Sequence, residues 1–327
     1  MALDFSYILI IDISPLLAKS DDPKMAQDPE VLDVVAQLDK ACTQAGFFYV
    51  KGHGIPDTLL KGVRDITRTF FELPYEEKAK IKMTPANGFR GYEKMGENLT
   101  EGTPDMHEAI DCYREVTKGM YGDLGKVMEG CNQWPQNPPK FNLVMEEYIG
   151  LCKDLARKIM RGIALALGGS PYEFEGDRAG DPFWVMRIIG YPGVSTVNDI
   201  GWFAIYWSFL FNRYHYSVIC CIACNNSSLL YDILLSSSLL SCLILFRYRV
   251  YVVKLLKVKN LSGEWISASP VPGSFVCNIG DMLKTNFDAV VEPLDTYKTR
   301  TNGDKRSERA VYGEHLVRKV LTNFVEE

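Results

Sequence analysis

The stretch from Trp202 to Val253 sets the main limit on how this chain can fold, because its composition differs from that of both flanks. It is filled with Phe, Ser, Tyr, Cys, Leu and Ile and shows neither a helical nor a strand period. Its only charged residues are Arg213, Asp232, Arg247 and Arg249. The sequence therefore consists of two patterned parts separated by an apolar segment.

Three interpretations of this segment stay open. Leu229 to Phe246 carries a single charge and is followed by Arg247 and Arg249, which fits a marginal transmembrane helix. Asp232 and the serines at 236–238 oppose that interpretation. The second interpretation is a buried insertion. The third is translated non-coding sequence such as a retained intron, since T-rich codons encode these residue types.

Amphipathic helices are predicted before this segment. Asp28 is a good N-cap and Gly46 a terminator for a helix over 28–46, and apolar spacing predicts another over 59–70. A long helix over 142–167 is closed by glycines. Its apolar stripe is predicted to contain Tyr148, Leu151, Leu155, Ile159 and Ile163.

Short β-type runs fill much of the rest. Residues 1–17 are interpreted as a buried first strand, followed by an extended run at 47–50. After the long helix, runs at 183–191, 264–267 and 274–279 are separated by Pro and Gly, which is typical of an antiparallel sandwich or barrel. We predict an α+β fold with an N-terminal α/β cap and helices and a β core.

Charge and cysteine content exclude several classes of protein. A net charge of -5 and a pI near 5.6 give no electrostatic reason to expect nucleic acid or an anionic membrane surface as a partner. No Lys or Arg precedes the apolar stretch near the N-terminus, unlike in a signal peptide. The nine cysteines are an odd number, and those outside 202–253 lack framework spacing. We expect a cytoplasmic monomer.

Short motifs occur on both sides of the apolar segment. The first part carries Gly46-Phe47-Phe48-Tyr49-Val50 with Gly52-His53-Gly54-Ile55, Phe71-Glu72-Leu73-Pro74 and Gly88-Phe89-Arg90-Gly91-Tyr92. The rest carries Arg187-Ile188-Ile189-Gly190-Tyr191-Pro192, Gly263-Glu264-Trp265-Ile266 and Asn278-Ile279-Gly280-Asp281. Together they resemble plant Fe(II)/2-oxoglutarate-dependent dioxygenases of the isopenicillin-N-synthase-like superfamily.

The resemblance implies a double-stranded β-helix, or jelly-roll, core that is distorted and incomplete in this chain. In the family, Fe(II) is held by a His-x-Asp pair on one strand and a distal His on another, which leaves positions for bidentate 2-oxoglutarate and for O2. An Arg-x-Ser pair anchors the far carboxylate of the co-substrate. By resemblance, the chain is an oxidoreductase acting on a small organic substrate, with Fe(II) and 2-oxoglutarate as cofactors.

The metal ligands implied by this resemblance are missing from the sequence. None of the four histidines is followed two positions later by Asp or Glu. These histidines are His53, His107, His215 and His315. Where the family has its His-x-Asp strand, soon after an Asp-Ile-Gly like that at 199–201, the apolar segment begins, and no Arg-x-Ser or Arg-x-Thr occurs. We assign no catalytic residue and no metal ligand, and predict that cofactor binding and activity are defective.

A few polar residues remain as site candidates. Tyr191 is a 2-oxoglutarate contact by resemblance, with core packing as the alternative. Arg187 lies in an otherwise apolar strand, so it is a candidate for the substrate pocket, with an ion pair as the alternative. His107, beside Glu108 and Asp111, either lines a pocket mouth or serves a cap or loop. His53 is expected in a turn.

The resemblance also predicts an organisation and three functions. We expect an N-terminal dioxygenase region at 1–140, a jelly-roll core region at 141–284 interrupted at 202–256, and a C-terminal tail and helix at 285–327. The candidate functions are an oxidoreductase by descent, inactive as written, a non-catalytic binding or regulatory remnant, and a membrane-anchored variant through 229–246. Because lost internal strands expose sheet edges, we predict partial unfolding around 202–256.

Overall fold

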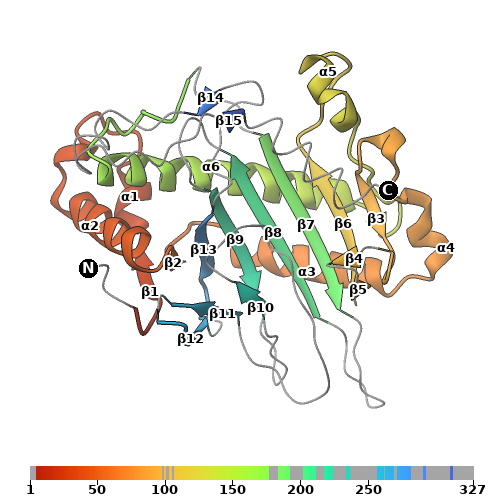
Figure 1. Ribbon diagram of the computed structural model, residues 1–327, viewed down its shortest axis with the longest axis horizontal. Coiled ribbons are helices and arrows are strands. Elements are labelled where there is room, and N and C mark those ends of the chain that lie inside the picture. The colour runs from red at the N-terminus through yellow and green to blue at the C-terminus, as the bar shows by residue number, and fades with distance from the viewer. Residues whose placement is uncertain are drawn as a thin grey trace.

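The protein is described by a computed structural model whose main element is an eight-stranded sheet (Figure 1). The structure describes residues 5–97, 99–100, 103–104, 107–176, 183–191, 202–210, 217–223, 233–235, 256–260, 262–268, 271–280, 290–291 and 310–311. The strands follow the order β1-β2-β13-β9-β8-β7-β6-β3. Only β1 and β2 are parallel, and every other neighbouring pair is antiparallel.

The strands of this sheet come from most of the chain. They are β1 (Leu9–Asp12), β2 (Phe47–Lys51), β3 (Gly91–Glu93), β6 (Glu108–Tyr113), β7 (Phe183–Tyr191), β8 (Trp202–Leu210), β9 (Ser217–Ala223) and β13 (Phe275–Gly280). Half of them precede residue 140. The predicted N-terminal region and the predicted core region therefore share one sheet.

Three smaller sheets accompany the large one. Strands β10 (Ile233–Leu235), β11 (Leu256–Lys259) and β12 (Trp265–Ala268) form a three-stranded sheet. The two-stranded sheets pair β14 (Val290–Val291) with β15 (Ala310–Val311) and β4 (Leu99–Thr100) with β5 (Thr103–Pro104). Ile266 and Ala268 of β12 pack with Tyr49 and Val276, so this strand covers the large sheet at its β2–β13 end.

Three longer helices pack behind the large sheet, where Figure 1 shows α6 running across the strands. These are α2 (Pro29–Gln44), α3 (Asp57–Phe71) and α6 (Phe141–Ala166). The predicted cap of α2 is confirmed, since Oδ1 of Asp28 accepts hydrogen bonds from the backbone N–H groups of Glu30 and Val31 at 3.0 and 3.2 Å. The short helices are α1 (Ser14–Ala18), α4 (Tyr75–Lys78) and α5 (Gly122–Gly125), and 3₁₀ turns occur at Met25–Gln27, Ala79–Ile81, Pro85–Asn87 and Lys126–Met128.

The two faces of the sheet have different surroundings. Alternate residues of β6 and β7, such as Ile110, Cys112 and Ile188, pack in the main core with the helices. We call this side the helical face. Because successive strand residues point to opposite sides, Asp111 and Arg187 lie on the other side, which we call the distal face.

Two predicted elements differ in detail from the structure. The first strand covers only Leu9–Asp12, because Oδ1 of Asp12 accepts a hydrogen bond from the backbone N–H of Ser14 at 2.9 Å and the chain turns into α1. Leu151 does not belong to the buried stripe of α6 and is 36% exposed. The stripe instead passes through the buried Cys152.

The apolar segment, whose sequence shows no strand period, contains strands of the large sheet. Residues 202–210 and 217–223 are the interior strands β8 and β9, which pair with each other and with β7 and β13. An alternating pattern marks a strand with one solvated face, whereas a strand that is covered on both faces is often a continuous apolar run. Aromatic and β-branched residues, abundant in both stretches, also favour strands.

The transmembrane interpretation finds no support in the described residues. Within 229–246 the structure describes only Ile233–Leu235, which is a strand, and the rest of that range lies outside the described residues. Among the helices that can be described, none is long and apolar enough to cross a membrane.

Candidate functional site

A polar cluster occupies the distal face where β3, β6 and β7 lie side by side. It consists of Glu93 at the end of β3, His107 just before β6, Asp111 and Tyr113 in β6, and Arg187 in β7. We call it the Arg187 cluster. Asp111 and Arg187 are register partners, and Ala109 of β6 pairs with Glu93. Sheet register therefore brings together residues that are far apart in sequence.

The guanidinium of Arg187 lies at the centre of this cluster. Its Nη2 donates to Oε2 of Glu93 at 2.5 Å and lies 3.4 Å from Nε2 of His107. Its Nε lies 3.4 Å from Oδ1 of Asp111, an ion pair without hydrogen-bond geometry. The hydroxyl of Tyr113 donates to Oδ2 of the same aspartate at 3.2 Å. Arg187 is thus held between two carboxylates from different strands.

Burial controls the charges in the Arg187 cluster. Asp111 is 2% exposed and Glu93 is 6% exposed, so both carboxylates are largely removed from water. Burial raises the pKa of Asp111, and the neighbouring Arg187 opposes that rise. Burial, together with the positive charge of Arg187, lowers the pKa of His107 to about 3. His107 is therefore neutral near pH 7.

The structure tests part of what the sequence predicted for these residues. Arg187 does form an ion pair, and its role in a substrate pocket stays a prediction. His107 lies buried in the loop just before β6, which agrees with the loop alternative and not with a helix cap, and its place at a pocket mouth stays a prediction. Tyr191 ends β7 opposite Trp202, its side chain is not among the described atoms, and its contact with 2-oxoglutarate stays a prediction. Glu93 was missed, although its place directly after the Gly-Phe-Arg-Gly-Tyr motif was a usable signal.

The donors expected for iron do not come together in the described residues. His53 occupies a turn, as predicted: its Nδ1 accepts a hydrogen bond from the backbone N–H of Ile55 at 3.1 Å, and its ring lies 4.3 Å from that of Phe275. His215 and His315 lie outside the described residues. In the part of the chain that is described, no three His, Cys, Asp or Glu residues could share a metal ion. These donors do not fit the iron site that the resemblance implies.

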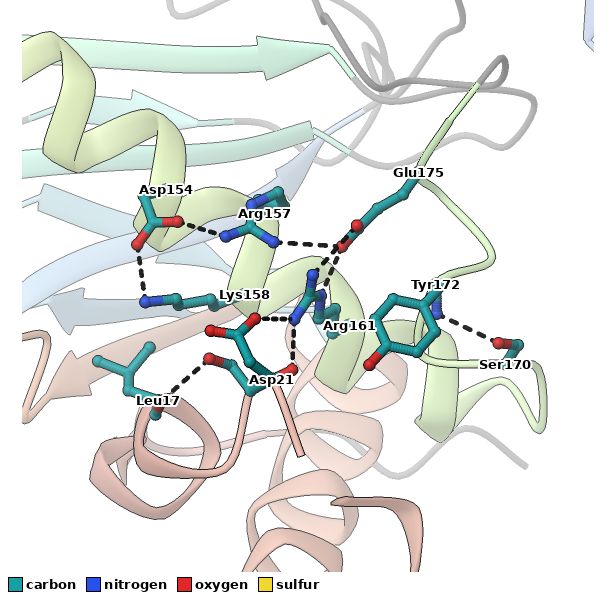
Figure 2. Close-up of polar contacts among 10 residues, drawn as sticks. Leu17, Asp21, Asp154, Arg157, Lys158, Arg161, Ser170, Tyr172 and Glu175 are labelled. Carbon is teal, nitrogen blue, oxygen red and sulfur yellow. Dashed lines mark hydrogen bonds and ion pairs between the residues drawn. The ribbon is translucent and has the colours of Figure 1, made fainter. Parts of the chain in front are cut away.

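A second polar cluster has a structural role. Figure 2 shows Arg161 of α6 between Asp21 and Glu175. Arg161 is 4% exposed, and its guanidinium lies 2.9 Å from Oδ1 of Asp21 and 2.5 Å from Oε1 of Glu175. It also donates to the carbonyl of Ser20 and lies over the ring of Tyr172. These contacts fasten the segments before α2 and after α6 to one helix, away from the distal face.

Comparisons with known proteins bear on this fold and this site. Residues 8–137 match the family described as non-haem dioxygenase in morphine synthesis N-terminal. A homoarginine-6-hydroxylase of the 2-ODD type from Glycine max is 64% identical over 356 aligned residues, covering 100% of both chains. The chain belongs to the Fe(II)/2-oxoglutarate-dependent dioxygenase family. A second dioxygenase of this kind, a homoarginine-6-hydroxylase from Arabidopsis thaliana, is 53% identical and covers 99% of both chains.

Solved structures agree with the dioxygenase fold. A full-length Neurospora crassa protein in complex with alpha-KG superposes with a TM-score of 0.67 at 19% identity, covering 96% of each chain. A 2OG-Fe(II) oxygenase family protein from Caulobacter crescentus gives 0.65 at 18% identity, with 97% of this chain and 99% of that one covered. The predicted α+β fold with a jelly-roll core is confirmed for this dioxygenase chain.

Proposed function

We propose that this chain is a dioxygenase by descent that keeps the substrate side of its site but does not catalyse hydroxylation. The observation that carries this proposal is the donor set. The family's His-x-Asp pair has no counterpart in these 327 residues, because no histidine among them is followed two positions later by an acid. Iron held by fewer ligands would lack the fixed geometry that presents co-substrate and O2 on one side.

The comparison with the Glycine max relative supports this loss. Its alignment runs over 356 positions, which exceeds the 327 residues of this chain. Some positions of the alignment therefore have no residue in this chain. We propose that these positions include a shortened segment after Lys284, where the resemblance places the distal His and the Arg-x-Ser pair.

The substrate side is proposed to descend from one that binds a basic amino acid. Both plant relatives described above are named homoarginine-6-hydroxylases. Homoarginine carries a guanidinium group, and the Arg187 cluster offers two buried carboxylates, from Glu93 and Asp111. This chemistry favours a cationic small molecule as the ligand, and a non-catalytic binding role as the second candidate function.

The proposed inactivity is tested by titrating the purified chain with Fe(II) and 2-oxoglutarate without oxygen. The Glycine max relative, prepared in the same way, serves as the positive control. We expect the visible charge-transfer band of iron-chelated 2-oxoglutarate from the relative and no such band from this chain. With air and homoarginine, we expect no succinate above the protein-free background. A band of comparable intensity, or succinate formation that depends on homoarginine, would refute the proposal.

A further inference from the structure

The Arg187 cluster has more acceptor capacity than Arg187 uses. A carboxylate offers about four lone-pair positions across its two oxygens. Oδ1 of Asp111 receives no hydrogen bond from the residues that the structure describes and lies 3.4 Å from Nε of Arg187 in an ion pair, although Asp111 is 2% exposed. Buried polar atoms of native proteins are nearly always hydrogen-bonded, and Nε of Arg187 is too poorly aligned to donate to this oxygen, so Oδ1 of Asp111 can accept a hydrogen bond from a further donor.

We propose that Glu93 and Asp111 form a subsite for the guanidinium group of a ligand, beside the guanidinium of Arg187. This inference rests on the proposed descent from homoarginine hydroxylases and names the residues that would recognise such a molecule. A planar guanidinium presents several N–H donors in a fixed fork, which suits two neighbouring carboxylates. Tyr113 supports the subsite because its hydroxyl fixes the orientation of Asp111.

The charge and position of the cluster favour a cation over an anion. Among the described residues, the carboxylates of Glu93 and Asp111 both pair with Arg187, and His107 adds no positive charge near pH 7. A ligand carboxylate placed at Arg187 would approach both buried acids, and like charges repel strongly where water is excluded. The side chain of Arg187 is 23% exposed, so solvent reaches the cluster from the distal face.

The test compares two ligands of nearly the same shape on the metal-free full-length chain. L-homoarginine carries the guanidinium, whereas L-homocitrulline carries a neutral urea group in its place. Isothermal titration calorimetry in EDTA-containing buffer is expected to show homoarginine binding at least about 10-fold more tightly, because hydrogen bonds between charged groups are stronger than those of a neutral urea. Equal affinity for the two ligands, or binding of neither, overturns the proposal.

A pair of matched variants assigns the preference to the subsite. Glu93→Gln keeps the shape of the side chain and removes its charge, so we expect the preference for homoarginine to fall about 10-fold or more. The control is Glu97→Gln, which alters a more exposed acid paired with Lys82 at 2.8 Å and is expected to change nothing. A full preference in Glu93→Gln overturns the proposal. If that variant does not fold, the comparison of ligands on the unaltered chain decides the question.

The proposed inactivity and the proposed guanidinium subsite fail in different ways. Turnover of 2-oxoglutarate with added Fe(II) refutes the inactivity and leaves the guanidinium subsite standing. The absence of any preference for homoarginine in metal-free buffer refutes the subsite, even when no turnover occurs.

Discussion

At the scale of single residues, buried polar groups in this protein depend on partners that are distant in the sequence. Arg90 is fully buried, and its guanidinium donates to the carbonyls of Met128 and Arg114 at 2.7 and 2.6 Å. These bonds are long-range, so Arg90 fixes the loops around β3 in place of binding a ligand. Its appearance in a family motif therefore has a structural explanation.

His107 gives the protein a predictable dependence on pH. The pKa of His107 is lowered from 6.5 to about 3 in the folded state. Between these two pH values the imidazole is protonated in the unfolded chain and neutral in the folded chain. The free energy of unfolding is therefore unaffected by this residue above pH 6.5, and below that pH it falls by about 1.4 kcal/mol for each pH unit. We expect His107→Gln to flatten the curve of unfolding free energy against pH between 6.5 and 5, measured by urea unfolding.

The unaltered chain is the reference for this measurement. His53, whose pKa burial also lowers, contributes equally to both proteins and cancels in the difference. Parallel stability curves for the two proteins would show that His107 does not have the lowered pKa.

At the scale of elements, local sequence signals predicted the three longer helices but did not predict the interior strands β8 and β9. The N-cap of α2 and the apolar spacing of α3 and α6 were correct within a few residues. These signals act over one or two turns, so they can be found in the sequence. Strands β8 and β9 gave no comparable signal, because a continuous apolar run has no period.

Helix α6 depends on Arg161 to hold the segments on either side of it. We expect Arg161→Met to lower the free energy of unfolding by about 2 kcal/mol, since it removes charge-assisted hydrogen bonds from a buried side chain. Arg157→Met is the matched control on the same helix, because its side chain is 34% exposed and its ion pairs lie at the surface. The control should change stability by less than about 1 kcal/mol. Equal losses in both variants, measured by urea unfolding, would contradict the anchoring role.

At the scale of the whole molecule, continuity of the large sheet depends on the apolar segment. Strands β8 and β9 fill the space between β7 and β13, which would otherwise present unpaired edges. Since both stretches form paired strands, we expect them to be folded, whereas the sequence predicted partial unfolding around 202–256. The origin of the segment, whether an insertion or translated non-coding sequence, stays a prediction.

Hydrogen exchange tests this role of the segment. We expect backbone amides of 202–210 and 217–223 to exchange more slowly than those of 91–93, because β3 lies at the end of the sheet and only an isolated bridge from Lys82 flanks its other side. Mass spectrometry of peptides from the intact chain gives both rates in one experiment. Fast exchange across both interior strands would restore the prediction of local unfolding.

The family and the class of fold could be recognised along the chain, because motifs and caps are local features. The lack of an acid two positions after any of the four histidines is equally local, and the defective metal site inferred from it stays a prediction. The Arg187 cluster could not be recognised in this way. Glu93 and Arg187 are 94 positions apart, and their contact depends on the order and register of β3, β6 and β7. Strand pairing is set by the packing of the entire sheet, so neither residue carries a local sign of its partner.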